Sequence, residues 1–103
     1  MQMFQKKRIE IFIEAPLLRK IAECLDAAEV TGYSVLALAS GKGSAGAWSA
    51  DSQVGQSGQM YAVVCIADAA IAEKAVETVF SVIDLQIGMV TISDVAVVRP
   101  ARF

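Results

Sequence analysis

Hydrophobic and polar residues alternate along residues 8–14, and this period of two predicts a β-strand. Ile9, Ile11 and Ile13 would lie on one face of that strand. The other face would carry Arg8, Glu10, Phe12 and Glu14. Three more segments are apolar enough to be strands, namely residues 31–40, 60–67 and 90–98. The chain therefore supplies four strands for one sheet.

Two segments repeat their apolar residues at helical spacing. In the first, Pro16 is suited to an opening turn, and Gly32 would close the region. Its apolar stripe is Leu17, Ile21, Leu25 and Ala28. In the second, Asp68 is a favourable N-cap residue. Its stripe is Ile71, Ala72, Ala75, Val76, Val79, Phe80 and Ile83.

The predicted order of elements is strand, helix, strand, strand, helix, strand. This order is typical of an α+β, ferredoxin-like βαββαβ sandwich, an antiparallel sheet with two helices on one face, built as a single domain from residues 1–103. Right-handed crossovers place both helices on the same face, so the second face lacks cover within one chain. The strands carry apolar side chains toward both faces, at Val35, Ala37, Val63, Val64, Ile66, Val90 and Ile92. We therefore expect a closed homo-oligomer.

Residues 41–58 form a long segment rich in glycine and serine between the two halves. Its 18 residues include five Gly, four Ser and only two charged residues, too little apolar surface to offset the entropy of ordering the backbone. We expect a flexible, functional loop. Its single tryptophan, Trp48, either packs back on the domain or anchors a partner protein.

Composition narrows the class of protein. Apolar residues make up 55% of the sequence and charged residues 19%, which favours an interface with another subunit. The net charge of −2 argues against nucleic acid as a partner. No apolar stretch reaches the roughly 18 residues of a membrane span, so a cytoplasmic chain without membrane insertion is expected. Cys24 and Cys65 lie far apart in a chain without histidine, which favours two buried thiols over a redox or metal site.

Catalytic groups are scarce. The chain has no histidine and no Gly-x-Ser-x-Gly motif, and neither cysteine has a neighbouring general base. Glu10 and Glu14 would be about 13 Å apart on one strand, too far for a paired acid and base, and are expected to be solvated charges. The sequence Gly41-Lys42-Gly43-Ser44 lacks the spacing of a Walker A loop. We therefore expect a protein that is not an enzyme and has no cofactor or metal.

Several segments, in this order and spacing, resemble the PII signalling superfamily. They are KRIEIFIEAP at residues 7–16, VTGYSV at 30–35, VCIAD at 64–68, QIGMVTI at 86–92, and VVR with a second arginine at 97–102. The resemblance spans nearly the whole chain. It implies a homotrimer that signals by binding adenine nucleotide in clefts between subunits, and that contacts a target protein through residues 41–58, the T-loop of the family.

The resemblance also assigns residues to the nucleotide site. Gly32 and Ser34 would lie near the adenine, together with the backbone of Cys65. Arg99 and Arg102 would form fork-like hydrogen bonds to phosphate oxygens. The remaining candidates, at the start of the T-loop and in the segment equivalent to the family's B-loop, are Gly41, Lys42, Gly43, Gln86, Ile87 and Gly88.

Departures from the family pattern refine the expected ligands. The stretch at residues 84–88 lacks the lysine of the family's B-loop, so ADP or AMP is expected to bind in preference to ATP. The shortened T-loop is similar to that of PII-like proteins associated with inorganic carbon. This resemblance implies bicarbonate as a second ligand and a membrane bicarbonate transporter as the target. The transporter would recruit the protein to the inner membrane.

Two alternatives remain. A structural or small-ligand-binding trimer without a nucleotide site would have the same fold. An acylphosphatase-like enzyme would need an anion-binding loop where this chain has Glu14-Ala15-Pro16.

Overall fold

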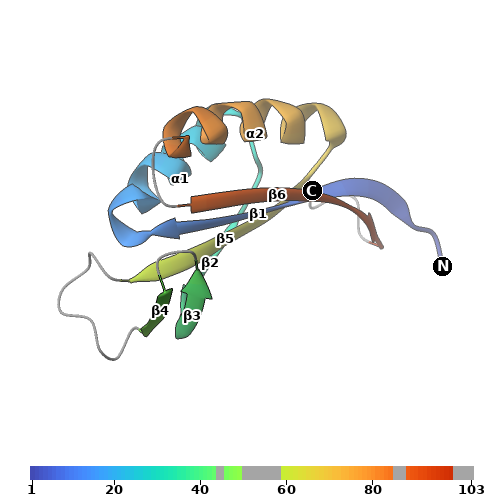
Figure 1. Cartoon of the computed structure of the whole chain (residues 1–103). Helices are drawn as coiled ribbons and strands as arrows, with labels where there is room; N and C mark the ends of the chain where they lie inside the picture. Colours follow the sequence, from blue (N-terminus) through green and yellow to red (C-terminus); the bar gives the residue numbers. More distant parts are fainter. Residues whose placement is uncertain (44–45, 50–58, 85–87, 99–103) are drawn as a thin grey trace.

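The computed structural model describes residues 1–43, 46–49, 59–84 and 88–98 of the 103-residue chain. Its main sheet contains β1 (Phe4–Glu14), β2 (Ser34–Leu38), β5 (Met60–Ala67) and β6 (Gly88–Val97) in the order β2-β5-β1-β6. All neighbouring strands are antiparallel. Two helices, α1 (Leu18–Ala27) and α2 (Ala69–Ile83), lie on one face of this sheet (Figure 1). The predicted ferredoxin-like α+β fold is therefore confirmed.

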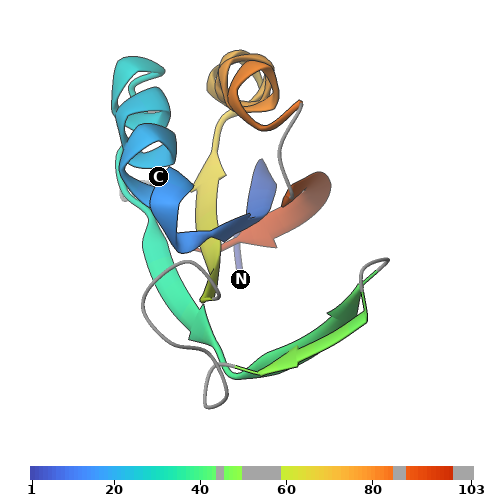
Figure 2. The ribbon, with the colours of Figure 1, turned by 60° about the vertical axis from the view of Figure 1, so that its left-hand side comes forward.

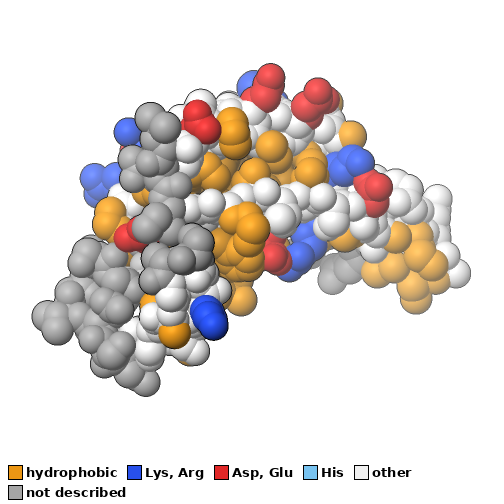
Figure 3. All heavy atoms as spheres, viewed as in Figure 1, with side chains coloured by type: hydrophobic (Ala, Val, Ile, Leu, Met, Phe, Trp, Pro, Cys, Tyr) orange, Lys and Arg blue, Asp and Glu red, His pale blue; other side chains and the backbone are white. Residues whose placement is uncertain are grey.

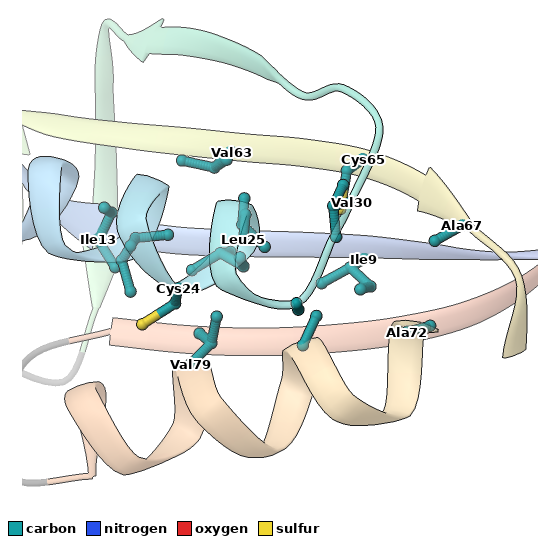
Figure 4. Close-up of a cluster of buried hydrophobic side chains, with 14 of the residues drawn as sticks. Ile9, Ile13, Cys24, Leu25, Val30, Val63, Cys65, Ala67, Ala72 and Val79 are labelled. Atoms are coloured by element: carbon teal, nitrogen blue, oxygen red, sulfur yellow. The ribbon is translucent and has the colours of Figure 1, made fainter. Parts of the chain in front are cut away.

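The alternating pattern of the first strand predicts its buried face correctly. Ile9, Ile11 and Ile13 are fully buried on β1, and they pack with residues of β5 and both helices in one core (Figure 4). The strand is longer than expected, because residues 4–7 also pair with residues 94–97 of β6. β5 has the predicted bounds, and β6 begins two residues earlier than predicted.

β1 lies in the middle of the sheet, between β5 and β6. Its second face is the one without helices, and there the Arg8 guanidinium Nη1 lies 2.8 Å from Glu10 Oε2 in an ion pair. The prediction that Glu10 is a solvated charge is wrong. Its side chain is three-quarters buried on a central strand, and its carboxylate is paired with a cation.

The first helix ends in a way that the sequence does not predict. A 3-10 turn at Ala15–Leu17 precedes α1, with Pro16 in the opening turn as expected. The helix ends at Ala27, and Glu29 adopts a left-handed backbone with a φ of 66°. The Val30 N–H donates to the Leu25 carbonyl (3.1 Å) and the Glu29 N–H to the Asp26 carbonyl (3.0 Å), as in a Schellman motif. The helix is thus closed at Glu29, before Gly32 is reached.

The second helix buries a narrower stripe than predicted. Ala72, Ala75, Val79 and Ile83 are buried, but Phe80, assigned to the same stripe, is 54% exposed. Asp68 occupies the N-cap position with extended backbone. Its carboxylate accepts a hydrogen bond from the Lys6 ammonium, so it ties α2 to β1. Neither helix in the described part of the chain has the length and hydropathy needed to cross a membrane.

The segment after β2 differs from the loop that we expected. Part of residues 41–58 forms a β-hairpin of β3 (Ser40–Gly43) and β4 (Gly46–Ser49). The hairpin continues from β2 and projects away from the helices (Figure 2). Gly46 begins β4 with a φ of +109°, a conformation that favours glycine. Residues 44–45 and 50–58 lie outside the described part of the chain.

Candidate functional site

The candidate site lies where β2 separates from β5. The first pair between these strands is Ser34 with Val64, so Cys65, Ile66 and Ala67 extend beyond the start of β2. On its other side this part of β5 pairs with β1. The chain leading into β2 runs past the free edge of β5 and leaves an open pocket of about 340 Å³. The pocket is lined by Thr31, Gly32, Tyr33, Ser34, Val64, Cys65 and Ile66.

The lining combines three kinds of group. Val64 and Ile66 supply apolar side chains, and Thr31, Tyr33 and Ser34 are residues with hydroxyl groups. The part of β5 beyond Val64 has no pairing residue in β2, so its backbone N–H and C=O groups on that edge are available to a ligand. Such a site is suited to a flat, partly apolar molecule with hydrogen-bonding groups at its edge.

Cys65 contributes to this pocket through its backbone. Its side chain is buried, in the same core cluster as Val30 (Figure 4). Burial raises the pKa of the Cys65 thiol, because removal from water disfavours the thiolate. The Cys24 thiol is also buried, with its pKa raised mainly by burial and secondly by Glu23. Both cysteines are free and buried, as predicted, so neither thiol is prepared to act as a nucleophile.

The structure brings together only some of the candidate nucleotide-binding residues. Gly32, Ser34 and Cys65 line the pocket. Gly41, Lys42 and Gly43 are on β3, and none of the three lines it. Gly88 begins β6, where it pairs with Ile13. Gln86, Ile87, Arg99 and Arg102 lie outside the described residues.

Gly88 and the pocket are on opposite edges of the sheet. β5 and β1 separate β2 from β6, and three steps of about 4.8 Å between neighbouring strands amount to about 14 Å. Gly88 also lies toward the end of the sheet at which β2 continues into the hairpin, whereas the pocket lies at the start of β2. Within one chain, the pocket and Gly88 are therefore separate.

Four pocket residues were not among the sequence candidates, namely Thr31, Tyr33, Val64 and Ile66. Thr31 and Tyr33 flank Gly32 in the segment that resembles the PII superfamily, so a reading of the whole segment would have included them. Val64 and Ile66 alternate with Cys65 along β5, and the sequence pattern predicts only that they lie on a face of the sheet. Among the described residues, no cluster of His, Cys, Asp and Glu is suited to hold a metal ion.

Trp48 packs against the facing strand of its own hairpin. It pairs with Gly41, and a Cβ atom placed on Gly41 would come within 2.6 Å of the Trp48 indole. The indole therefore covers the backbone of Gly41, an arrangement that stabilises glycine in a strand by shielding it with an aromatic ring. Of the two interpretations of Trp48, this geometry favours packing on the same chain, onto the hairpin. It also gives Gly41 a structural role.

This contact predicts the effect of Gly41→Ala. The added methyl group would displace the indole, because a contact of 2.6 Å is too short. We expect the Trp48 fluorescence emission to shift to longer wavelength and acrylamide quenching to increase. Gly43→Ala is the matched control, since its Cβ would meet no atom within 4 Å. Equal emission and quenching in the two variants would contradict the contact.

Comparisons with known proteins agree with this fold. A family model described as nitrogen regulatory protein P-II matches residues 6–102. The chain is also similar to the structure of CPII, a nitrogen regulatory PII-like protein from Thiomonas intermedia K12, bound to ADP, AMP and bicarbonate. The TM-score is 0.89 at 24% identity, with 99% of this chain and 96% of that chain covered.

Two further structures are similar. CPII bound to ADP and bicarbonate has a TM-score of 0.85 at 24% identity, with 99% of this chain and 97% of that chain covered. A putative PII-like signaling protein from Thermus thermophilus has a TM-score of 0.82 at 17% identity, with 100% and 99% covered. At these identities the structures establish the fold alone. A search of curated proteins finds no match. The family model covers nearly all of the sequence, and the chain therefore belongs to the nitrogen regulatory protein P-II family.

Proposed function

We propose that this protein is a PII-like signalling protein that binds an adenine nucleotide in clefts between the subunits of a homotrimer. The observation that carries the proposal is the pocket between residues 31–34 and the free edge of β5. It contains Gly32, Ser34 and the backbone of Cys65, which the family resemblance assigns to the adenine. CPII, which is bound to ADP, AMP and bicarbonate in one structure, supports the same class of ligand.

The chemistry of the pocket suits adenine. The base has an apolar ring face, which can pack against Val64 and Ile66, and an edge that both donates and accepts hydrogen bonds. A strand edge offers the complementary backbone N–H and C=O groups. Recognition of this kind would select the base through the backbone of β5, and it would leave the buried Cys65 thiol uninvolved.

A site between subunits also accounts for the separation of the candidate residues. Gly88 and the pocket lie on opposite edges of the sheet, so a second copy would have to bring one to the other. Gln86, Ile87, Arg99 and Arg102 are proposed to bind the phosphates from their positions beside β6 in the sequence. Without the family's B-loop lysine, ADP or AMP would bind in preference to ATP.

The protein would signal by binding its ligands, without catalysing a reaction. Bicarbonate would bind next to the nucleotide, and the T-loop, residues 41–58 with Lys42 and Trp48, would carry the response to a target protein. We propose an inorganic-carbon transporter as that target, with the protein cytoplasmic and recruited to the membrane through it. The competing function, a trimer without a nucleotide site, shares the fold and predicts no nucleotide binding.

Calorimetry distinguishes these two functions. AMP, ADP, ATP and cyclic AMP are titrated into the protein, each with and without bicarbonate. We expect ADP and AMP to bind more tightly than ATP, and bicarbonate to change the dissociation constant of the bound nucleotide. Arg99→Ala and Arg102→Ala should weaken ADP binding. Absence of heat at millimolar concentrations of all four nucleotides would refute the proposal in favour of the trimer without a site.

A further inference from the structure

The flank of α2 that faces away from α1 carries an exposed aromatic ring. α1 lies on the other side of α2, where the Cys24 Sγ is 4.0 Å from the Thr78 carbonyl oxygen. Phe80 follows Thr78 by two positions, about 200° around the helix, so it lies on the opposite flank, on the side of β6 (Figure 2). Val76, one turn earlier on this flank, is partly buried against the core. Phe80 itself is 54% exposed, so the packing of one chain does not bury its ring.

β6 extends this apolar surface. Val90 and Ile92 pair with Ile11 and Ile9 of β1, so both lie on the face of the sheet that the helices cover. Val90 is partly buried against the core, and Ile92 is 47% exposed. Hydrophobic side chains accordingly form a band between α2 and β6, with acidic side chains along α2 above it (Figure 3). An apolar surface shared by two elements is a candidate contact surface, whereas a single exposed apolar residue needs no explanation.

Three carboxylates border this band on its outer side. Glu73, Glu77 and Asp84 lie within about 60° of Phe80 around the helix axis, and all three are exposed. Lys74, the only cation of α2, lies about 120° from Phe80, toward water. Three other carboxylates of the chain are each paired with a lysine or arginine of β1. Among the described residues the three on α2 have no such partner, so their negative charge is uncompensated.

The spacing of these groups indicates the chemistry of a partner. Glu73 and Glu77 are one helical turn apart, about 6 Å along the axis, and Asp84 is about 10 Å further on. An apolar centre with a charged border is the usual arrangement of a protein–protein interface. Here the complementary surface would be an apolar stripe flanked by lysine or arginine, about three helical turns long. The same charges argue against phosphate-bearing partners and against self-association through this flank, since both bring like charges together.

We propose that this surface, which we call the acidic flank, binds a basic amphipathic helix of a partner protein. It consists of the apolar residues Val76, Phe80 and Ile92 and the carboxylates of Glu73, Glu77 and Asp84. The apolar stripe of the partner helix packs on Phe80, and its lysine or arginine side chains pair with the carboxylates, as in other complexes in which a helix binds along an apolar surface.

The acidic flank is separate from the proposed nucleotide site. Ile83, at the end of α2, lies beside Gly88, where an added Cβ would be 3.6 Å from the Ile83 Cβ. The flank therefore begins at the end of the sheet from which the β3–β4 hairpin also projects (Figure 1). A partner that contacts the hairpin could approach the acidic flank from the same end. Binding there requires no nucleotide, so the inference goes beyond the proposed function.

A synthetic peptide tests the acidic flank. The probe is a fluorescently labelled helix of about 15 residues, with leucine along one stripe and lysine on both sides of it. The control peptide has glutamate in place of lysine. We expect fluorescence anisotropy to detect binding of the lysine peptide alone, and Phe80→Ala to weaken that binding by about tenfold. Absence of binding at millimolar protein, or equal binding to Phe80→Ala, would overturn the proposal.

Paired charge variants separate a specific contact from general attraction to an acidic protein. Glu73→Gln with Glu77→Gln removes two carboxylates from the flank, and we expect weaker peptide binding with less dependence on salt. Glu23→Gln with Asp26→Asn removes two exposed carboxylates from α1 and should leave peptide binding unchanged. An equal loss of binding in the two double variants would show that only net charge matters, and the proposal would fail.

Light scattering and ADP titration of Phe80→Ala distinguish the remaining occupants. We expect the mass of the assembly and the affinity for ADP to equal those of the unaltered protein, because Phe80 does not line the pocket. A smaller mass would assign the flank to a contact between copies of the chain and would overturn the proposal. Peptide binding by a protein that binds no ADP would refute only the nucleotide proposal, and ADP binding without peptide binding would refute only the acidic flank.

Discussion

Gly32→Val is expected to lower the affinity for ADP by at least about tenfold, equivalent to about 1.4 kcal/mol, while leaving the thermal stability of the protein unchanged. Gly32 lines the pocket, and a valine side chain there would occupy space that the adenine needs. The fold should tolerate the change, because a Cβ at Gly32 meets no atom within 4 Å and its backbone φ is not in the left-handed region. Calorimetric titration and thermal unfolding measure the two effects separately.

Two further variants show whether this effect is steric and local. Gly32→Ala adds a smaller group and should lower the affinity less than Gly32→Val. Ser81→Val makes a β-branched residue at an exposed position of α2, away from the pocket, and should leave ADP binding unchanged. If Gly32→Val bound ADP as tightly as the unaltered protein, the adenine would have to bind elsewhere, and the pocket could no longer support the proposed function.

The main sheet could be predicted from sequence because its burial follows a local period. Ile9, Ile11 and Ile13 alternate on a strand with one buried face, and the continuous apolar run of β5 gives its bounds directly. The helices can be predicted because apolar residues recur every three or four positions. Each of these signals is contained within about ten residues, so no knowledge of distant contacts is needed.

The hairpin and Phe80 could not be predicted in this way. The composition of residues 41–58 indicates a loop, whereas in the structure β3 and β4 pair and the Trp48 indole covers Gly41, a contact between facing strands that composition does not reveal. Phe80 fits the apolar spacing of α2, yet it lies about 100° around the helix from Val79, outside the arc that is buried. Periodicity identifies an apolar stripe, whereas the packing of neighbouring elements decides how wide its buried part is.

The candidate site was predicted only in part, for a related reason. The family resemblance identified Gly32, Ser34 and Cys65, and the structure places these three in one pocket. The resemblance also predicts that Gly88 binds this ligand, but within one chain Gly88 lies on the opposite edge of the sheet. A list of residues contains no information on which copy of the chain would supply each one, so the sequence pattern alone does not say whether one chain can form the whole site.

Ile11→Ala is expected to lower the free energy of unfolding by about 2–5 kcal/mol, a large part of the roughly 5–15 kcal/mol typical of a native protein. Ile11 is fully buried on the central strand β1, with Val63 opposite it on β5 and Val90 on β6. Removing its side chain beyond Cβ would leave a cavity between the sheet and the helices that neighbouring strands cannot close. Denaturant unfolding at a fixed protein concentration measures the change, because assembly makes stability depend on concentration.

The loss in free energy of unfolding should increase with the side-chain volume removed from the core. Ile11→Val should lower the free energy of unfolding by only about 0.5–1.5 kcal/mol, since it removes one methylene group. Phe80→Ala removes a larger side chain but from an exposed position of α2, where changes typically stay within about 0.5 kcal/mol. A loss in Phe80→Ala as large as in Ile11→Ala would mean that Phe80 is covered in the assembled protein, and helix α2 would then have to be part of an interface between subunits.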